Sequence, residues 1–213
     1  MTNLSYIHRF EPGSDPAAPP LLLLHGTGGH EHDLIPLGQE LSPGSALLSP
    51  RGDVLEHGMP RFFRRLAEGV FDLKEVASRA HALADFIAAA SKHYGINPQR
   101  LVAVGLSNGA NIAASLLVLR PESLAGAVLL RPMVVLEPLQ LPDLSGKKVL
   151  ISSGTADPIV PPDHPVRLAK MFRQAGARVS LHQHPAGHGL VPADLVATRE
   201  FLTGDQHSRR LGH

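Results

Sequence analysis

The sequence contains no cysteine, and this absence removes several kinds of chemistry at once. Without thiols the chain has no disulfide framework, no thiolate metal site and no cysteine nucleophile. Long apolar runs are also missing, because no stretch approaches the ~20 residues that a membrane-spanning helix needs. The first ten residues lack a basic segment followed by an apolar one, so a secretion signal is not expected. We therefore predict a cytoplasmic protein.

An excess of charge of one sign is missing as well. Lys and Arg number 20 against 19 Asp and Glu, so neither nucleic acid nor an anionic membrane surface is an expected partner. Hydrophobic residues make up 43% and charged residues 18%, which is typical of a globular chain. For 213 residues we predict one domain over 1–213, with a compact core at about 18–203 and a flexible tail at about 204–213.

Short apolar runs alternate with helical patterns along the chain. Apolar runs typical of strands occur at 21–24, 46–49, 101–104, 127–130, 149–152 and 178–182. Helical spacing occurs at 33–41, 76–94, 110–120, 166–175 and 192–202. The alternation predicts the α/β class, with a mostly parallel central sheet, helices on both faces and no large cap domain. At 54–72 the periodicity fades, which favours a functional loop.

The chain is organised around the pentapeptide Gly105-Leu106-Ser107-Asn108-Gly109. An apolar run leads into it and small residues follow, which is the pattern of a buried strand, a tight turn and a helix. The two glycines leave room for a nucleophile elbow, which presents the serine hydroxyl at the carboxyl edge of a sheet. A glycine-rich turn with an incidental serine is the competing interpretation, so the prediction depends on partners elsewhere.

A serine hydroxyl is a weak nucleophile and needs a base, commonly histidine, that is oriented by a carboxylate. In this type of elbow fold the order along the chain is serine, then an acid, then histidine. Asp157 follows a predicted strand, and His188 follows the last predicted strand between two glycines. We therefore predict a triad of Ser107, Asp157 and His188, with His184 as the alternative base. The competing interpretation of Asp157 is a turn residue before Pro158.

Acyl transfer also needs hydrogen-bond donors for the charge that develops on the carbonyl oxygen, each worth about 3–4 kcal/mol when removed. One expected donor is the N–H of Asn108, directly after the nucleophile. The other is expected from the loop His25-Gly26-Thr27-Gly28-Gly29, with Thr27 as the favoured residue. This loop does not match the phosphate-binding glycine patterns. Histidines at 25, 30 and 32 lack the carboxylate spacing of a metal site, so no metal and no cofactor are predicted.

Apolar residues in the loops after the strands are the candidates for a substrate pocket. Phe62 and Phe63 lie in the irregular segment, and Met133 and Val134 follow a predicted strand, so we predict these four as substrate-binding residues. Local packing is the competing interpretation for all of them. Arginines at 61, 64 and 65 are expected to pair with nearby glutamates on a solvated face, the alternative being attraction of an acidic substrate group.

Four motifs together carry a resemblance to a known family. They are the His-Gly-Thr-Gly-Gly loop, the Gly-Leu-Ser-Asn-Gly-Ala elbow, the Gly-Thr-Ala-Asp-Pro turn and the Gly-His-Gly loop. With them, about 18–203 of the chain resembles the phospholipase/carboxylesterase family of the α/β-hydrolase superfamily. The stretch 50–72 looks like its bacterial carboxylesterase branch associated with hydroquinone resistance. The resemblance implies the α/β-hydrolase fold, a serine esterase, and the triad and oxyanion residues named above.

These observations predict a serine carboxylesterase that acts through an acyl-enzyme on a small-molecule ester. The alternatives are a thioesterase or a lysophospholipase with the same triad. Asn108 stands where acyl-protein thioesterase relatives carry glutamine, which disfavours a lipidated protein as substrate. A non-catalytic binding protein on a hydrolase scaffold is the least favoured interpretation. A homodimer is left open.

Overall fold

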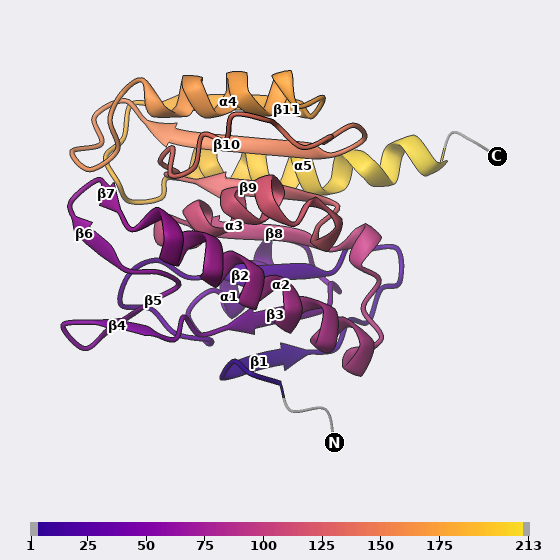
Figure 1. Ribbon diagram of the computed structural model, residues 1–213. Helices are drawn as coiled ribbons and strands as arrows, with labels where there is room; N and C mark the ends of the chain where they lie inside the picture. Colours follow the sequence, from indigo (N-terminus) through magenta and orange to yellow (C-terminus); the bar gives the residue numbers. More distant parts are fainter. Residues whose placement is uncertain (1–3, 211–213) are drawn as a thin grey trace.

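A seven-stranded sheet forms the centre of the molecule (Figure 1). The structure, a computed structural model, describes residues 4–210, and for 205–210 it describes the helical backbone alone. In spatial order the strands are β1 His8–Glu11, β3 Leu47–Pro50, β2 Leu21–Leu24, β8 Val102–Leu106, β9 Gly126–Leu130, β10 Lys148–Gly154 and β11 Arg178–His184. β1 runs antiparallel to β3, and the remaining neighbours in this sheet are parallel. The mostly parallel sheet predicted from the alternating pattern is therefore confirmed.

Helices cover both faces of the sheet, and within residues 4–210 no large cap domain lies over it. They are α1 Ile35–Leu41, α2 Leu73–Tyr94, α3 Asn108–Leu119, α4 His164–Gln174 and α5 Pro192–Arg210, with 3₁₀ turns η1 Pro98–Arg100 and η2 Pro121–Ser123. In Figure 1, α2, α3 and α4 lie in front of the sheet and α1 and α5 lie behind it. The bounds of α2 follow from local chemistry. The Asp72 carboxylate accepts a hydrogen bond from the N–H of Glu75 at its start, and Gly95, with φ 70°, ends it.

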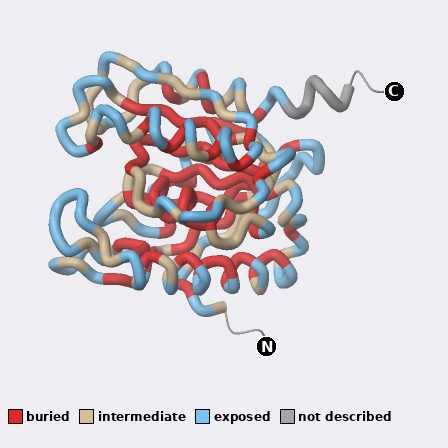
Figure 2. Tube along the Cα trace, turned by 45° about the horizontal axis from the view of Figure 1, so that its top comes forward, coloured by how far each residue is buried: buried red, intermediate tan, exposed pale blue. Residues whose placement is uncertain are grey.

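The core is divided by the sheet into two apolar layers, and β2 shows why. Its four consecutive leucines are all fully buried. Leu22 and Leu24 belong to the layer under α2 and α3, whereas Leu21 and Leu23 belong to the layer under α1 and α5. Figure 2 shows the same burial along the central strands. An unbroken apolar run is what a parallel strand covered on both faces requires, and each buried leucine contributes about 1.5–3 kcal/mol.

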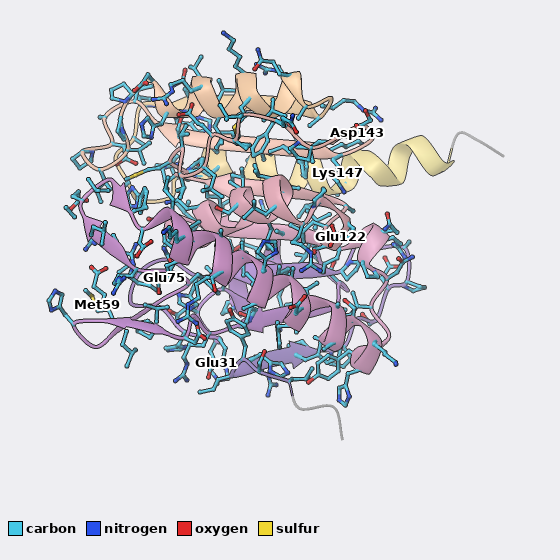
Figure 3. All side chains as sticks on the ribbon, viewed as in Figure 1. Glu31, Met59, Glu75, Glu122, Asp143 and Lys147 are labelled. Carbon is cyan, nitrogen blue, oxygen red and sulfur yellow. The ribbon has the colours of Figure 1, made fainter. Side chains whose placement is uncertain are left out.

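Between β3 and α2 the chain leaves the sheet and forms what we call the hairpin segment, residues 51–72. It contains two small antiparallel pairs, β4 Val54–Glu56 with β5 Met59–Arg61, and β6 Arg65–Ala67 with β7 Val70–Phe71. In Figure 1 these hairpins lie at the left, beside the edge where the parallel strands end, and Figure 3 places Met59 there. Sequence periodicity missed the first hairpin because its turn is His57-Gly58, with φ 51° and 80°, where Asn-Gly is the usual signal.

The last helix is longer than the sequence predicts. The expected end is residue 202, but α5 continues to Arg210 and passes through Gly204. A glycine inside a helix costs only about 1 kcal/mol, so it does not force the helix to stop. Part of the predicted tail is therefore helical, and 211–213 lie outside the described residues. Within residues 4–210, no helix has both the length and the apolar character of a membrane span.

Candidate active site

Ser107 stands at the sharp turn between β8 and α3, with φ 53°. A residue other than glycine rarely adopts this backbone conformation. It is typical of the strained turn in a nucleophile elbow. A Cβ on Gly105 would lie 2.5 Å from the carbonyl oxygen of Gly109, and a Cβ on Gly109 would lie 1.9 Å from that of Leu24. Glycine is therefore required on both sides of Ser107, because the turn folds back on itself and packs against β2.

Ser107, His188 and Asp157 form a continuous hydrogen-bonded row. Nε2 of His188 lies 2.9 Å from Oγ of Ser107, and Nδ1 of His188 lies 2.8 Å from Oδ2 of Asp157. A carboxylate only accepts hydrogen bonds, so the Asp157 contact assigns the imidazole proton to Nδ1. Nε2 is then free to accept the hydroxyl proton of Ser107. This is the arrangement of a nucleophile, its base and an orienting carboxylate.

The Asp157 carboxylate is held in its ionised form. Its side chain is fully buried, which by itself opposes ionisation. The N–H groups of Ile159 and Val160 donate to Oδ1 at 2.8 and 3.2 Å, and His188 donates to Oδ2. Against the cost of burial, these donors hold the pKa of Asp157 below its usual 3.8. The aspartate therefore carries a negative charge at neutral pH, next to the imidazole that it orients.

The glycine-rich segment 25–29, which we call the oxyanion loop, follows β2 beside the elbow. Leu24 of β2 pairs with Gly105 of β8 in the parallel sheet, so the oxyanion loop and the elbow leave the sheet at the same level. Thr27 and Asn108 line the same cavity as Ser107. The two residues predicted as oxyanion donors thus lie beside Ser107.

The hairpin segment holds the oxyanion loop through the main chain. The N–H of Gly28 donates to the carbonyl oxygen of Pro60 at 2.9 Å, and the N–H of Gly52 donates to Nε2 of His25 at 2.9 Å. Nδ1 of His25 lies 2.7 Å from the carbonyl oxygen of Gly26, so this nitrogen carries the proton. Burial lowers the pKa of His25 below 6.5, which matches a neutral ring with one donor and one acceptor nitrogen.

Side chains connect the same regions. Nη1 of Arg61 donates to Oγ1 of Thr27 at 2.5 Å, and the Arg61 side chain is almost fully buried. The N–H of Phe62 donates to Oδ1 of Asn108 at 2.8 Å. The side chain of Asn108 therefore joins the elbow to the hairpin segment, while its main-chain N–H remains the predicted oxyanion donor.

A cavity of about 530 Å³ opens at Ser107 and His188. A volume in this range suits a small organic ligand. Besides Ser107 and His188, apolar and charged side chains line it. The apolar ones are Phe71, Leu106, Met133, Ile159 and Leu190, and the charged ones are Arg61, Arg65 and Glu68. We call the apolar residues of this lining the apolar wall and the charged residues the charged wall.

Of the four residues predicted to bind substrate, Met133 lies on this cavity. Phe62 and Phe63 are only 1% and 0% exposed and belong to the core, where Phe63 contacts Phe71 edge-on. Val134 packs against the same core. The two phenylalanines lie in the core and not on the cavity, because the hairpin segment needs apolar side chains to anchor it to α2 and the sheet.

The arginines of the hairpin segment have carboxylate partners. Nε of Arg65 lies 2.7 Å from Oε1 of Glu56, and Nε of Arg61 lies 3.4 Å from the other oxygen of Glu56. Nη2 of Arg64 lies 2.9 Å from Oδ2 of Asp72. Arg64 is on the solvated face that the sequence predicts, whereas Arg61 is buried between Glu56 and the oxyanion loop.

Two residues near the site were missed by sequence reasoning. Arg131 and Asp194 form an ion pair at 2.7 Å in which both side chains are fully buried. The Arg131 guanidinium also reaches the main chain on either side of His188. An arginine directly after a buried strand, at the sheet edge where ligands bind, is the signal that points to it. The alternative base His184 contacts this pair, with Nε2 3.8 Å from Oδ1 of Asp194.

The histidines that follow β2 have separate partners. His30 lies 3.0 Å from Oδ1 of Asp33, and His32 lies 3.4 Å from Oε1 of Glu31. In the part of the chain that the structure describes, no three His, Asp or Glu side chains are arranged to hold a metal ion. These histidines make local contacts, and His25 makes those of the oxyanion loop.

Comparison with known proteins agrees with this geometry. The model of the Dienelactone hydrolase family matches residues 60–195. MhqD of Bacillus subtilis (strain 168), whose name places it among the hydrolases, is 45% identical over 194 residues, which cover 91% of this chain and 96% of that protein. The residues that the family model matches include the elbow, the Asp157 turn and the His188 loop.

Solved structures give the same result. The crystal structure of the Bacillus cereus carboxylesterase is similar with a TM-score of 0.92 and 44% identity, over 95% of this chain and 96% of that one. The carboxylesterase from Mesorhizobium loti is similar with a TM-score of 0.89 and 33% identity, over 96% and 97%. The resemblance to bacterial carboxylesterases of the α/β-hydrolase superfamily is therefore confirmed.

Proposed function

The chain belongs to the dienelactone hydrolase family, and on that premise we propose that it is a serine carboxylesterase acting through an acyl-enzyme at Ser107. The family and the relatives make it an esterase-type hydrolase. The observation that carries the finer proposal is the row of hydrogen bonds from Ser107 through His188 to Asp157. Each residue stands in the role that this chemistry requires.

In the first half of the proposed reaction, Nε2 of His188 accepts the hydroxyl proton of Ser107 while Oγ attacks the ester carbonyl carbon. The carbonyl oxygen becomes an alkoxide, which the N–H groups of Thr27 and Asn108 stabilise. The tetrahedral intermediate then collapses: the bond to the alkoxy oxygen breaks, His188 returns its proton to that oxygen, and the alcohol leaves. The acyl group remains bound to Oγ of Ser107.

In the second half, water takes the place of the alcohol. His188 accepts a proton from the water, whose oxygen attacks the acyl carbon, and the same N–H groups stabilise the second alkoxide. Collapse releases the carboxylic acid and returns the proton to Ser107. Throughout, the Asp157 carboxylate holds the tautomer of His188 and stabilises the imidazolium that forms twice.

The cavity supports a small ester as the substrate. Its apolar wall, with Met133, Ile159 and Leu190, suits an aliphatic or aryl group. The charged wall, with Arg65 and Glu68, suits a polar substituent. We therefore propose short-chain esters in preference to long lipids.

The test is hydrolysis of short-chain aryl esters by the wild type, Ser107→Ala and a matched control, Ser91→Ala. Ser91 is also a buried serine, but it lies near the end of α2, and its hydroxyl has no hydrogen-bond partner among the described side chains and backbone. We expect Ser107→Ala to lower kcat by roughly 10⁴- to 10⁶-fold and Ser91→Ala to leave it unchanged. Turnover that survives in Ser107→Ala would overturn the proposal.

A panel of substrates separates the ester activity from its alternatives. Aryl esters of increasing acyl length, acyl-CoA thioesters and lysophospholipids are given to the same enzyme. The proposal expects the highest kcat/KM for a short-chain ester. A higher kcat/KM for a thioester or a lysolipid would move the assignment to the corresponding hydrolase, with the same triad.

A further inference from the structure

His188 sits in a short irregular connection, residues 185–191, that we call the His188 loop. It lies between the end of β11 and the start of α5. The N–H of Ala156 donates to the carbonyl oxygen of Ala186 at 3.0 Å, and that contact supports the first part of the loop. Glycine flanks His188 on both sides, which leaves the backbone free to adopt other conformations. A catalytic group must nevertheless be held to within ~0.5 Å.

Arg131 supplies the missing support. Its Nε donates to the carbonyl oxygen of Gly187 at 3.1 Å, and its Nη2 donates to the carbonyl oxygen of Gly189 at 2.8 Å. One planar guanidinium thus binds the residue before His188 and the residue after it. The planar group fixes the distance between the two carbonyls, as a lysine ammonium does not.

Asp194 and the sheet fix Arg131 in turn. Asp194 accepts from Nη1 at 2.9 Å and from Nη2 at 2.7 Å, and Ser152 of β10 donates to the same carboxylate at 2.5 Å. The N–H of Val191, at the end of the His188 loop, donates to it at 2.8 Å. The guanidinium therefore has one position, determined by β9, β10 and the first turn of α5.

Stability alone does not account for this pair. Both side chains are fully buried, and the desolvation of two charges offsets much of their attraction. Replacing such a pair by apolar residues is often neutral for stability. What apolar residues do not replace are the two hydrogen bonds to the carbonyls beside His188. We infer that Arg131 is a positioning residue that holds the imidazole of His188 at hydrogen-bond distance from Ser107.

The inference rests on the proposed esterase function and is tested with the double variant Arg131→Met/Asp194→Leu, which removes both buried charges together. The control is Arg100→Met. Arg100 also donates to loop carbonyls, those of Pro16, Ala17 and Ala18, but it precedes β8 and therefore lies at the opposite edge of the sheet. Thermal unfolding, kcat and KM for a short-chain aryl ester are measured for each protein, well below its melting temperature.

We expect the double variant to fold, to keep KM within about threefold and to lose kcat by roughly 10- to 100-fold, because a displacement of ~1 Å can cost 10²-fold. The low-field proton resonance of the His188 Nδ1–H in its bond to Asp157 should broaden. Arg131→Lys keeps the positive charge but not the planar guanidinium, so it should retain only part of the wild-type kcat. Arg100→Met should change neither kcat nor the resonance.

A folded double variant with wild-type kcat and an unchanged resonance overturns the inference and leaves the esterase intact. If the double variant does not fold, Arg131→Lys decides alone: wild-type kcat and resonance in that variant overturn the inference. A wild-type protein that hydrolyses no ester would instead contradict the proposed function. Turnover retained in Ser107→Ala would contradict the role of Ser107, and neither result depends on Arg131.

Discussion

The two loops on either side of Ser107 are held in different ways. The His188 loop is held from within the fold, by Arg131, which follows β9 and forms a fully buried ion pair with Asp194 of α5. The oxyanion loop is held from outside the sheet, by the hairpin segment, through Pro60, Gly52 and Arg61. The support of the His188 loop is buried inside the protein. The support of the oxyanion loop belongs to the hairpin segment, which has exposed apolar residues such as Leu55 and Leu66.

The difference has a functional consequence. Arg131 is fully buried and is not among the residues that line the cavity, so we expect the substrate not to contact it. Arg61 and Arg65 of the hairpin segment line the cavity, and Arg61 also holds Thr27. A substrate that binds against the charged wall therefore contacts the residues that hold the oxyanion loop. We expect substrate identity to affect the stabilisation of the alkoxide more than the geometry of the base.

The largest effect expected from a single side chain on the His188 side comes from Asp157→Asn. The amide keeps the shape but no longer selects the tautomer with the proton on Nδ1, so the base is lost in most molecules. We expect kcat for a short-chain aryl ester to fall by about 10⁴-fold with little change in melting temperature. A loss below tenfold in a steady-state assay would mean that the carboxylate does not orient His188.

A smaller effect is expected on the oxyanion side, from Arg61→Gln. Glu56 keeps its partner Arg65, so the fold should survive, while Thr27 loses its donor at 2.5 Å. Removal of a whole oxyanion donor costs about 10²–10³ in kcat, and a loosened one should cost about tenfold. The matched control is Arg64→Gln, which removes an exposed pair with Asp72 and should leave kcat within about twofold. Equal kcat in both variants would contradict a role for the hairpin segment in the oxyanion hole.

The two supports should also differ in pH dependence. Burial lowers the pKa of His25 below 6.5, although Asp33 and Glu31 nearby oppose the shift. The folded state therefore favours the neutral form of His25. The contribution of His25 to the free energy of unfolding is present above pH 6.5 and is lost as the pH falls toward the pKa of His25 in the folded state. Burial opposes ionisation of Asp194, but bonds from Arg131 and Ser152 hold its pKa below 3.8, so its contribution is lost only below pH 3.8.

Urea unfolding between pH 5 and 8 tests this difference, with His25→Gln as the variant that cannot titrate at this position. The wild type should be more stable than the variant at pH 8, and the gap should narrow toward pH 5, by at most about 1.4 kcal/mol per pH unit. Comparison with the variant cancels other histidines, such as His164, whose pKa burial also lowers. A gap that stays constant with pH would show that His25 is not held neutral.

Much of the fold follows from local patterns in the sequence. The apolar run of β2 and the helical spacing of α2 are each sufficient to identify an element, since a parallel strand is covered on both faces and an amphipathic helix on one. The positions of Ser107, Asp157 and His188 after separate strands follow from the same patterns, because parallel strands end at one edge. Their mutual distances come from the structure.

The rest depends on contacts between distant segments. Phe62 and Phe63 are apolar residues in a connection, and the sequence does not distinguish a core position from a cavity wall. Arg131 and Asp194 are 63 residues apart. The place of Arg131 after a buried strand points to the ligand-binding edge, but no local pattern pairs it with Asp194. Local patterns in the sequence therefore do not predict the two supports, Arg131 with Asp194 and the hairpin segment. These supports hold the residues that the local patterns do identify.

Capture of the acyl-enzyme would test the covalent role of Ser107 directly, in the wild-type protein. The wild type is mixed with an excess of a short-chain aryl ester, quenched in acid at millisecond times and mapped by peptide mass spectrometry. We expect an acyl group on the peptide that contains Ser107, formed together with a burst of released aryl alcohol. Both should be absent in Ser107→Ala. Full turnover with the acyl group on another residue, or retained in Ser107→Ala, would contradict the covalent role of Ser107.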